Sequence, residues 1–154
     1  MGKKSKLKII PLGGLDEIGK NMTAFEYGNE MIIVDCGMAF PDEEMPGVDM
    51  VINDIAYVEK NKSKLKGIFL THGHEDHIGG LPYFLKSINV PVYGTRLTIA
   101  LVEHKLKEHN LLSKVKVVNV RAGNVVDACK SFKVEFIRTN HSIADSVALA
   151  ITTP

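Results

Sequence analysis

The chain has 154 residues, of which 45% are hydrophobic and 24% charged, and its formal net charge at pH 7 is +1. This length allows one domain at most. Because the net charge is close to zero, it neither indicates nor excludes binding of nucleic acid, and evidence for such binding must come from a particular site. The two cysteines, Cys36 and Cys129, are too few for a disulfide framework. Because there is no secretory leader and no long apolar run, we expect a cytoplasmic protein without membrane contact.

The first half of the chain predicts strands, one helix and one long connection. Strands are expected over 6–12, 22–27, 30–35 and 67–70. Gly28-Asn29 is typical of a tight hairpin turn between the second and third of these. Residues 36–53 contain two prolines and two glycines and predict an irregular connection. Asp54 is expected to cap a helix over 54–65.

The second half alternates helices with strands. Helices are expected over 81–88 and 95–112, and strands over 90–94, 114–120, 131–138 and 146–153. The longer helix is predicted to bury a face made of Leu97, Ala100, Leu101, Leu106 and Leu111. The pattern as a whole predicts an α/β layered fold with a mixed sheet. Because the chain stops just after an apolar strand, we expect it to be part of a longer protein.

The stretch "LTHGHEDHIGG", residues 70–80, concentrates metal-ligand side chains directly after an apolar strand. His72 and His74 are two residues apart on an extended segment, so they point the same way and can share one ion. Asp76 and His77 follow a turn and are expected to face a second ion. Imidazole and carboxylate ligands suit zinc, with manganese as the alternative. A loop with incidental histidines and a closed structural metal site are the competing interpretations.

Four stretches in this order resemble a known family. They are "PLGGLDEIGKN", "VDCGMAFPDEEMPGVD", "THGHEDHIGGLPYFL" and "RTNHSIADS". The block His72-x-His74-x-Asp76-His77 resembles the metal motif of the metallo-β-lactamase superfamily, and the wider wording resembles bacterial ribonuclease J of its β-CASP group. The resemblance implies an αββα sandwich with a mixed sheet, truncated here to the first part of the domain.

The resemblance also implies roles for single residues. His72, His74 and His141 correspond to the ligands of a first zinc, and Asp76 and His77 to ligands of a second. Asp76 and His77 are also the candidate catalytic residues, with Asp76 orienting or deprotonating the attacking water.

Three further residues enter only through the resemblance. Asp35 is expected to hold the metal loop by hydrogen bonds without binding the metal itself, and a simple cap at the end of a strand is the alternative. The resemblance also allows a structural calcium ion bound by backbone oxygens near Pro46 and Val48. The alternative for residues 41–49 is a solvated acidic loop.

The resemblance implies a two-metal hydrolase of RNA phosphodiester bonds, with 5′-to-3′ exonuclease and endonuclease action on RNA that bears a 5′-monophosphate. Residues 1–154 would be the N-terminal part of the metallo-β-lactamase domain. A bridging aspartate, a distant histidine, the β-CASP insertion and the C-terminal domain have no counterpart here. We therefore expect the full-length protein to be the active, homo-oligomeric enzyme and these 154 residues to be inactive by themselves.

Two other functions remain open from the sequence. One is a hydrolase of the same superfamily that acts on a small ester, thioester or lactam. The other is a non-catalytic scaffold that binds partners or RNA with an incomplete ligand set. Sequence beyond Pro154 would discriminate between the hydrolase of small substrates and a nuclease. Measuring whether two metal ions bind would discriminate between the non-catalytic scaffold and an enzyme.

Overall fold

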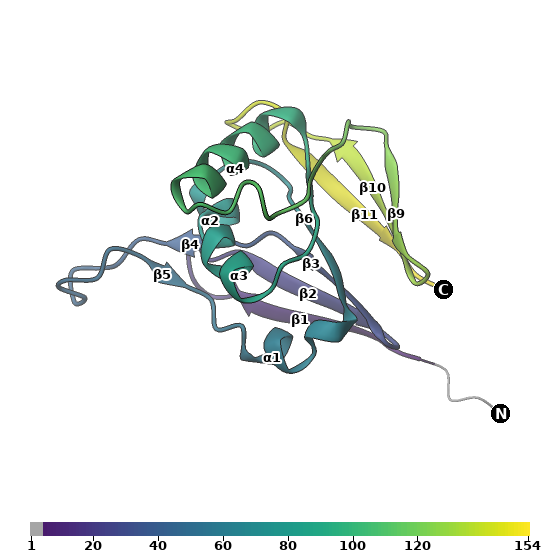
Figure 1. The fold of residues 1–154 in the computed structure, drawn as a ribbon, viewed down its shortest axis with the longest axis horizontal. Coiled ribbons are helices and arrows are strands. Elements are labelled where there is room, and N and C mark those ends of the chain that lie inside the picture. The colour runs from purple at the N-terminus through teal and green to yellow at the C-terminus, as the bar shows by residue number, and fades with distance from the viewer. Residues whose placement is uncertain (1–4) are drawn as a thin grey trace.

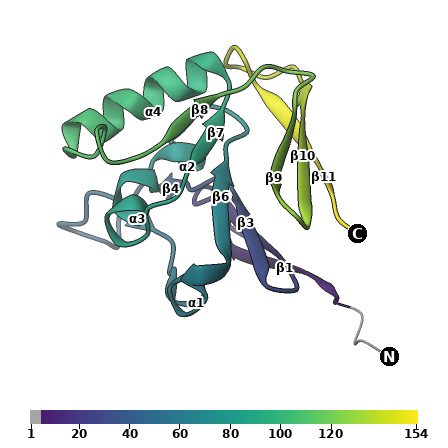
Figure 2. The same ribbon diagram turned by 45° about the vertical axis from the view of Figure 1, so that its right-hand side comes forward.

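The computed structural model describes residues 5–154 and has three layers (Figures 1 and 2). The middle layer is a six-stranded sheet of β1 (Leu7–Gly13), β2 (Met22–Tyr27), β3 (Glu30–Val34), β6 (Leu65–Phe69), β7 (Val92–Gly94) and β8 (Val117–Asn119). One face carries α1 (Ala56–Lys60), α2 (Glu75–Ile78), α3 (Leu81–Ser87) and α4 (Arg96–Glu108). The other faces a second sheet of β9 (Val125–Cys129), β10 (Phe132–Arg138) and β11 (Val147–Thr152). The predicted α/β fold with a mixed sheet is confirmed.

The direction of the strands determines where a site can form. The first three strands are antiparallel, and Gly28, with a φ of 61°, makes the predicted turn between β2 and β3. From β3 through β6 and β7 to β8 the pairing is parallel. Carboxyl ends of parallel strands meet at one edge of a sheet, and the loops that follow them are the usual place for ligands. The histidine-rich stretch leaves β6 at this edge.

Two hydrophobic cores hold the layers together. Neighbouring residues of β3 point to opposite faces, so Ile33 packs under the helices and Ile32 packs between the sheets. Phe69 of β6 is fully buried between the sheets; its ring stacks on that of Tyr93 with centroids 4.6 Å apart and is tilted against that of Phe136, with centroids 6.2 Å apart. A strand buried on both faces explains why "GIFL" carries no polar side chain.

Two connections differ from the sequence prediction. Within residues 36–53 the chain forms a short hairpin, β4 (Met38–Ala39) with β5 (Val51–Ile52), at the base of a protruding arm. The helix expected over 54–65 is only α1 followed by a 3-10 turn, Lys62–Lys64. Asp54 accepts a hydrogen bond from the N–H of Ala56 at 2.8 Å, but the residue at the N-cap position is Ile55.

The buried face of α4 was predicted wrongly. Its buried residues are Thr98, Ile99, Val102 and Leu106. Ala100 is exposed and Leu101 is 36% exposed, whereas the predicted Leu106 and Leu111 are buried. The helix carries apolar residues on more than one side, so the leucines alone did not identify the side that meets the sheet. Strand β9 was missed because its sequence, "VVDAC", lies within a stretch of polar and glycine residues.

No helix within residues 5–154 is both long and apolar enough to cross a membrane.

Glu26 is a buried carboxylate in β2 and predicts a pH-dependent stability. Its oxygens contact Lys8 at 2.7 Å and Lys64 at 3.3 Å, and accept a hydrogen bond from the Tyr57 hydroxyl at 2.9 Å. Burial raises the pKa of Glu26, but these three partners outweigh burial and the pKa is lowered overall. The lowered pKa stabilises the fold above the unfolded-state pKa of about 4.3, and this stabilisation is lost as pH falls through the folded-state pKa.

The substitution Glu26→Gln is therefore expected to lower the free energy of unfolding by about 1–2 kcal/mol at pH 7, and by progressively less below about pH 4. Urea denaturation at several pH values measures this. Asp127→Asn is the matched control, because Asp127 pairs with Lys133 at 3.6 Å with both side chains exposed, and should change little. An equal cost of Glu26→Gln at pH 7 and pH 3 would contradict the prediction.

Candidate metal centre

Three histidines meet at the carboxyl edge of the six-stranded sheet. His72 and His74 lie on the extended segment after β6, and His141 lies on the turn between β10 and β11. Each offers a ring nitrogen, and these three atoms lie within 4.8 Å of one another. His72 is buried, His74 is half-buried and His141 is exposed, so the group opens to solvent on one side. The structure thus brings His141, from a turn distant in sequence, next to His72 and His74, which are two residues apart.

Backbone hydrogen bonds hold the turn of His141 against the loop of His72. The N–H of Val147 donates to the carbonyl of Thr71 at 3.0 Å, which joins β11 to the end of β6. The N–H of Thr139 donates to the carbonyl of Ser146 at 3.2 Å and closes the base of the turn. Since these bonds involve main-chain atoms, the approach of His141 to His72 is fixed by the fold and not by the histidines alone.

A chain of hydrogen bonds determines which nitrogen of His72 faces the group. The Thr71 hydroxyl donates to Asp35 Oδ2 at 2.8 Å, because an ionised carboxylate can only accept. The same hydroxyl oxygen lies 2.9 Å from His72 Nδ1 and therefore accepts its proton. Nε2 of His72 is left with a lone pair, and it lies 3.1 Å from Nε2 of His141. Thr71 was not singled out from the sequence, where nothing marks it apart from its position between strand and histidine.

Asp35 also orients His77. Asp35 is buried, with a φ of 58° in the left-handed region that aspartate tolerates better than most residues. Its Oδ1 accepts from the N–H of Thr71 at 2.8 Å, and its Oδ2 lies 2.7 Å from His77 Nδ1. With Nδ1 of His77 as the donor, Nε2 carries the lone pair when the ring is neutral. Asp35 thus joins Thr71 and His77 by hydrogen bonds, and its role in holding a metal loop stays a prediction.

Nε2 of His77 and a carboxylate oxygen of Asp76 lie 3.4 Å apart, beside the three histidines. The side-chain amide of Asn21 donates to both, at 3.2 Å to His77 Nε2 and 3.1 Å to Asp76 Oδ2. In the structure it competes directly for the lone pairs of the two predicted ligands of a second ion.

The electrostatics of the buried His72 and the half-buried His77 differ. Burial, together with the neighbouring His77, His141 and His74, lowers the pKa of His72 to about 4. For His77, burial also lowers the pKa, but the hydrogen bond and negative charge of Asp35 raise it more, and the net direction is upward. His72 is therefore a neutral imidazole near pH 7, which is the form that binds metal.

The donor set fits a metal ion. Two nitrogens bound to zinc at 2.0–2.1 Å in a tetrahedron lie about 3.4 Å apart, close to the 3.1 Å between the Nε2 atoms of His72 and His141. Two lone pairs at this distance repel unless a proton or a cation lies between them. Three imidazoles with an open side also match the arrangement of a catalytic site better than that of a closed structural site.

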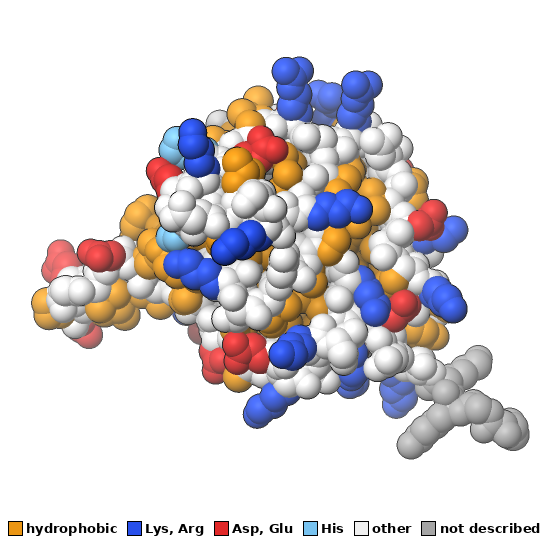
Figure 3. All heavy atoms as spheres, in the orientation of Figure 1, with side chains coloured by type: hydrophobic (Ala, Val, Ile, Leu, Met, Phe, Trp, Pro, Cys, Tyr) orange, Lys and Arg blue, Asp and Glu red, His pale blue; other side chains and the backbone are white. Residues whose placement is uncertain are grey.

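The remaining predicted residues lie elsewhere. Pro46 and Val48 are exposed near the tip of the arm, whose side chains are acidic and apolar (Figure 3). Among residues 5–154 the acidic side chains of this arm form no candidate metal group with one another, so calcium binding through backbone oxygens stays a prediction. Cys36 is buried, and burial raises the pKa of its thiol, which agrees with a packing role and not with a nucleophile.

Residues 15–149 match the model of the metallo-β-lactamase superfamily, and the chain belongs to this superfamily. It is 52% identical to Ribonuclease J of Synechocystis over 96% of its length, and 50% identical to Ribonuclease J 2 of Staphylococcus epidermidis over 98%. The chain spans about a quarter of these relatives, 23% and 27% respectively. The metallo-β-lactamase fold protein YhfI of Bacillus subtilis superimposes with a TM-score of 0.61 at 22% identity, over 97% of this chain and 58% of that one. The resemblance identified from the sequence is confirmed.

Proposed function

We propose that this chain is part of a metal-dependent ribonuclease that hydrolyses RNA phosphodiester bonds. The observation that carries the proposal is the meeting of His72, His74 and His141, with their ring nitrogens within 4.8 Å, next to Asp76 and His77. The superfamily implies metal ions, and the names of the relatives supply the substrate class.

Different residues of this chain would have different roles in such a site. His72, His74 and His141 would hold a first zinc through neutral ring nitrogens, with manganese as the alternative. Asp76 and His77 would contribute to a second ion. Bound metal ions would make water a stronger acid and offset the negative charge that builds on the phosphoryl oxygens.

Asp35 and Asp76 would act without forming a covalent bond to the substrate. Asp35 keeps the proton of His77 on Nδ1, so that Nε2 stays available, and it fixes the loop through Thr71. Asp76, whose side chain is 41% exposed, would orient the attacking water and take its proton on a carboxylate oxygen. The Asn21 amide limits how strongly Asp76 and His77 alone can hold an ion, because it shares their lone pairs.

The further properties of the full-length protein are part of this proposal. They are 5′-to-3′ exonuclease action on RNA with a 5′-monophosphate, some endonuclease action, homo-oligomers and a cytoplasmic location. Residues 1–154 would be the N-terminal part of the metallo-β-lactamase domain, and the remaining ligands would lie in other parts of the protein.

The test uses the longest protein that the native reading frame encodes, loaded with zinc or manganese. We expect nucleotide release from a 5′-monophosphorylated RNA at a rate at least about tenfold above that from the 5′-triphosphorylated RNA. His77→Ala is expected to lower the rate by about 10²-fold or more, because it removes a proposed metal ligand. A fully metallated protein that cleaves neither RNA would reject the proposal and favour a small ester, thioester or lactam as substrate.

A further inference from the structure

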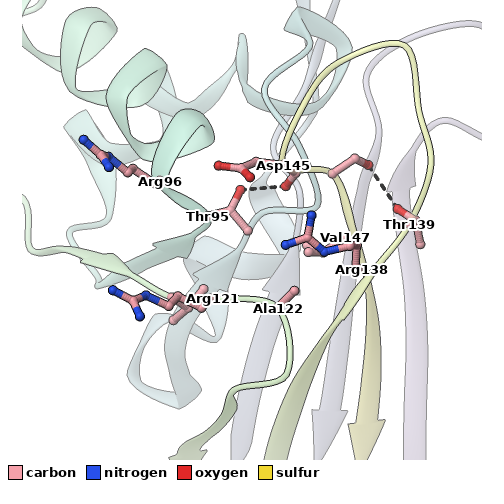
Figure 4. Close-up of a pocket in the computed structure, with 10 residues that line it drawn as sticks. Thr95, Arg96, Arg121, Ala122, Arg138, Thr139, Asp145 and Val147 are labelled. Carbon is pink, nitrogen blue, oxygen red and sulfur yellow. Dashed lines mark hydrogen bonds between the residues drawn. The ribbon is translucent and has the colours of Figure 1, made fainter.

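The arginines of this chain are distributed unlike its lysines. There are sixteen lysines and three arginines, and all three arginines line one pocket of about 240 Å³ (Figure 4). We call it the arginine pocket; no lysine lines it, and its polar lining includes Arg96, Arg121, Arg138, Thr139, Asp145 and Ser146. The arginines come from three elements: the start of α4, the turn between β8 and β9, and the end of β10.

The pocket carries uncompensated positive charge. None of the ion pairs among residues 5–154 includes an arginine. Asp145 is the one carboxylate in the lining, and its Oδ2 accepts a hydrogen bond from the N–H of Leu97 at 3.3 Å, at the start of α4. Arg138 points toward the middle of the pocket in Figure 4. A guanidinium group presents a planar fork of donors that matches the oxygens of a phosphate, which a lysine does not.

The arginine pocket adjoins the candidate metal centre through one turn. Thr139 and Ser146 line the pocket, and their hydroxyl oxygens lie 3.2 Å apart at the base of the turn that carries His141. His141 follows Thr139 by two positions along the chain, so their Cα atoms lie within about 7 Å of each other. The Thr95 hydroxyl donates to the carbonyl of Asp145 at 2.8 Å and ties the same turn to α4. An anion in the pocket would therefore lie at the base of the turn that carries His141.

We propose that the arginine pocket binds a backbone phosphate of the RNA strand, a few nucleotides from the bond at the metal centre. This proposal rests on the proposed ribonuclease function for the nature of the polyanion. The pocket supplies affinity and positions the strand, because phosphate contacts fix register without reading sequence. It takes no part in the chemical step.

Fluorescence anisotropy with a labelled single-stranded RNA, titrated at several salt concentrations, tests the proposal on this chain. We expect R96Q/R121Q/R138Q to weaken binding by at least about tenfold at 0.1 M salt and to reduce the slope of log K against log salt by about 2. R96K/R121K/R138K, which keeps the charge, should lose affinity but keep the slope. The matched control, K60Q/K62Q/K66Q, removes the same charge at the opposite end of β6 and should change affinity less than twofold.

The two proposals fail in different ways. Equal RNA affinity of R96Q/R121Q/R138Q and the control K60Q/K62Q/K66Q would overturn the arginine pocket as an RNA site. An unchanged salt slope in R96Q/R121Q/R138Q would overturn it as well. The cleavage assay on the full-length protein is independent of this comparison. RNA binding that depends on the arginines, without metal-dependent cleavage, would reject the ribonuclease and leave the pocket as an RNA-binding site. Because all three arginines are exposed, their substitution should leave the melting temperature nearly unchanged.

Discussion

Replacing His141 with alanine is expected to abolish tight zinc binding by this chain. The substitution leaves two of the three clustered imidazoles, and Nε2 of His72 loses the partner that lies 3.1 Å away. Loss of a residue that only orients a ligand costs about 10–100-fold in metal affinity, so loss of a ligand should cost more than about 100-fold. Competition with a chromophoric zinc chelator at pH 7 measures the affinity. His141 is the best of the three to replace because it is exposed, and its loss creates no cavity.

His104→Ala is the matched control for His141→Ala. The His104 side chain is 75% exposed on α4, and its nearest charged partner is Glu108 at 3.5 Å. Its removal should leave zinc affinity unchanged. Thermal unfolding gives a second readout, because zinc at 100 times its dissociation constant stabilises the folded chain by about 2.7 kcal/mol. This zinc-dependent rise in melting temperature should disappear in His141→Ala and persist in the control, and its persistence in both variants would contradict a site built on His141.

The sequence indicated the parts of the site that lie close together along the chain. His72 and His74 are two residues apart on an extended segment, and their shared direction follows from strand geometry. His141 lies 67 residues after His74, and only the family resemblance connected the two. The hydroxyl of Thr71, which links Asp35 to His72, and the amide of Asn21 against Asp76 depend on loops meeting in three dimensions. No local pattern predicts such meetings.

The fold was predictable where burial on both faces or a turn left a clear pattern. The wholly apolar end of β6 and the Gly28 turn are examples. The prediction failed for α4, where Ile99 and Val102 are buried and Leu101, in the middle of the helix, is exposed. A Cβ on Gly73 would meet Leu101 Cδ1 at 2.5 Å, so this leucine packs toward the histidine loop and not into the core. Helical periodicity does not distinguish those two kinds of contact.

Gly37→Ala is expected to destabilise the fold and displace the loop of Asp76 and His77 together. A Cβ on Gly37 would lie 1.6 Å from the carbonyl oxygen of Asp76 and 2.2 Å from its carbonyl carbon. Both are main-chain atoms, and the same carbonyl oxygen accepts a hydrogen bond from the N–H of Asn21 at 3.0 Å. The N–H of Cys36 also donates to the carbonyl of His77 at 2.8 Å, so the loop cannot retreat without breaking these bonds. Overpacking against backbone should cost about 3 kcal/mol or more.

For a domain of this size the cost of Gly37→Ala corresponds to a fall of roughly 6–12 °C in melting temperature, measured by circular dichroism. Gly47→Ala separates the steric effect from backbone strain. Gly47 has a φ of 82°, and a Cβ added there would have no atom within 4 Å, so alanine should cost only about 1 kcal/mol. A melting temperature for Gly37→Ala equal to that of Gly47→Ala would mean that the loop relaxes freely. In that case the close contact of Gly37 with Asp76 could not be what positions the predicted ligands of the second ion.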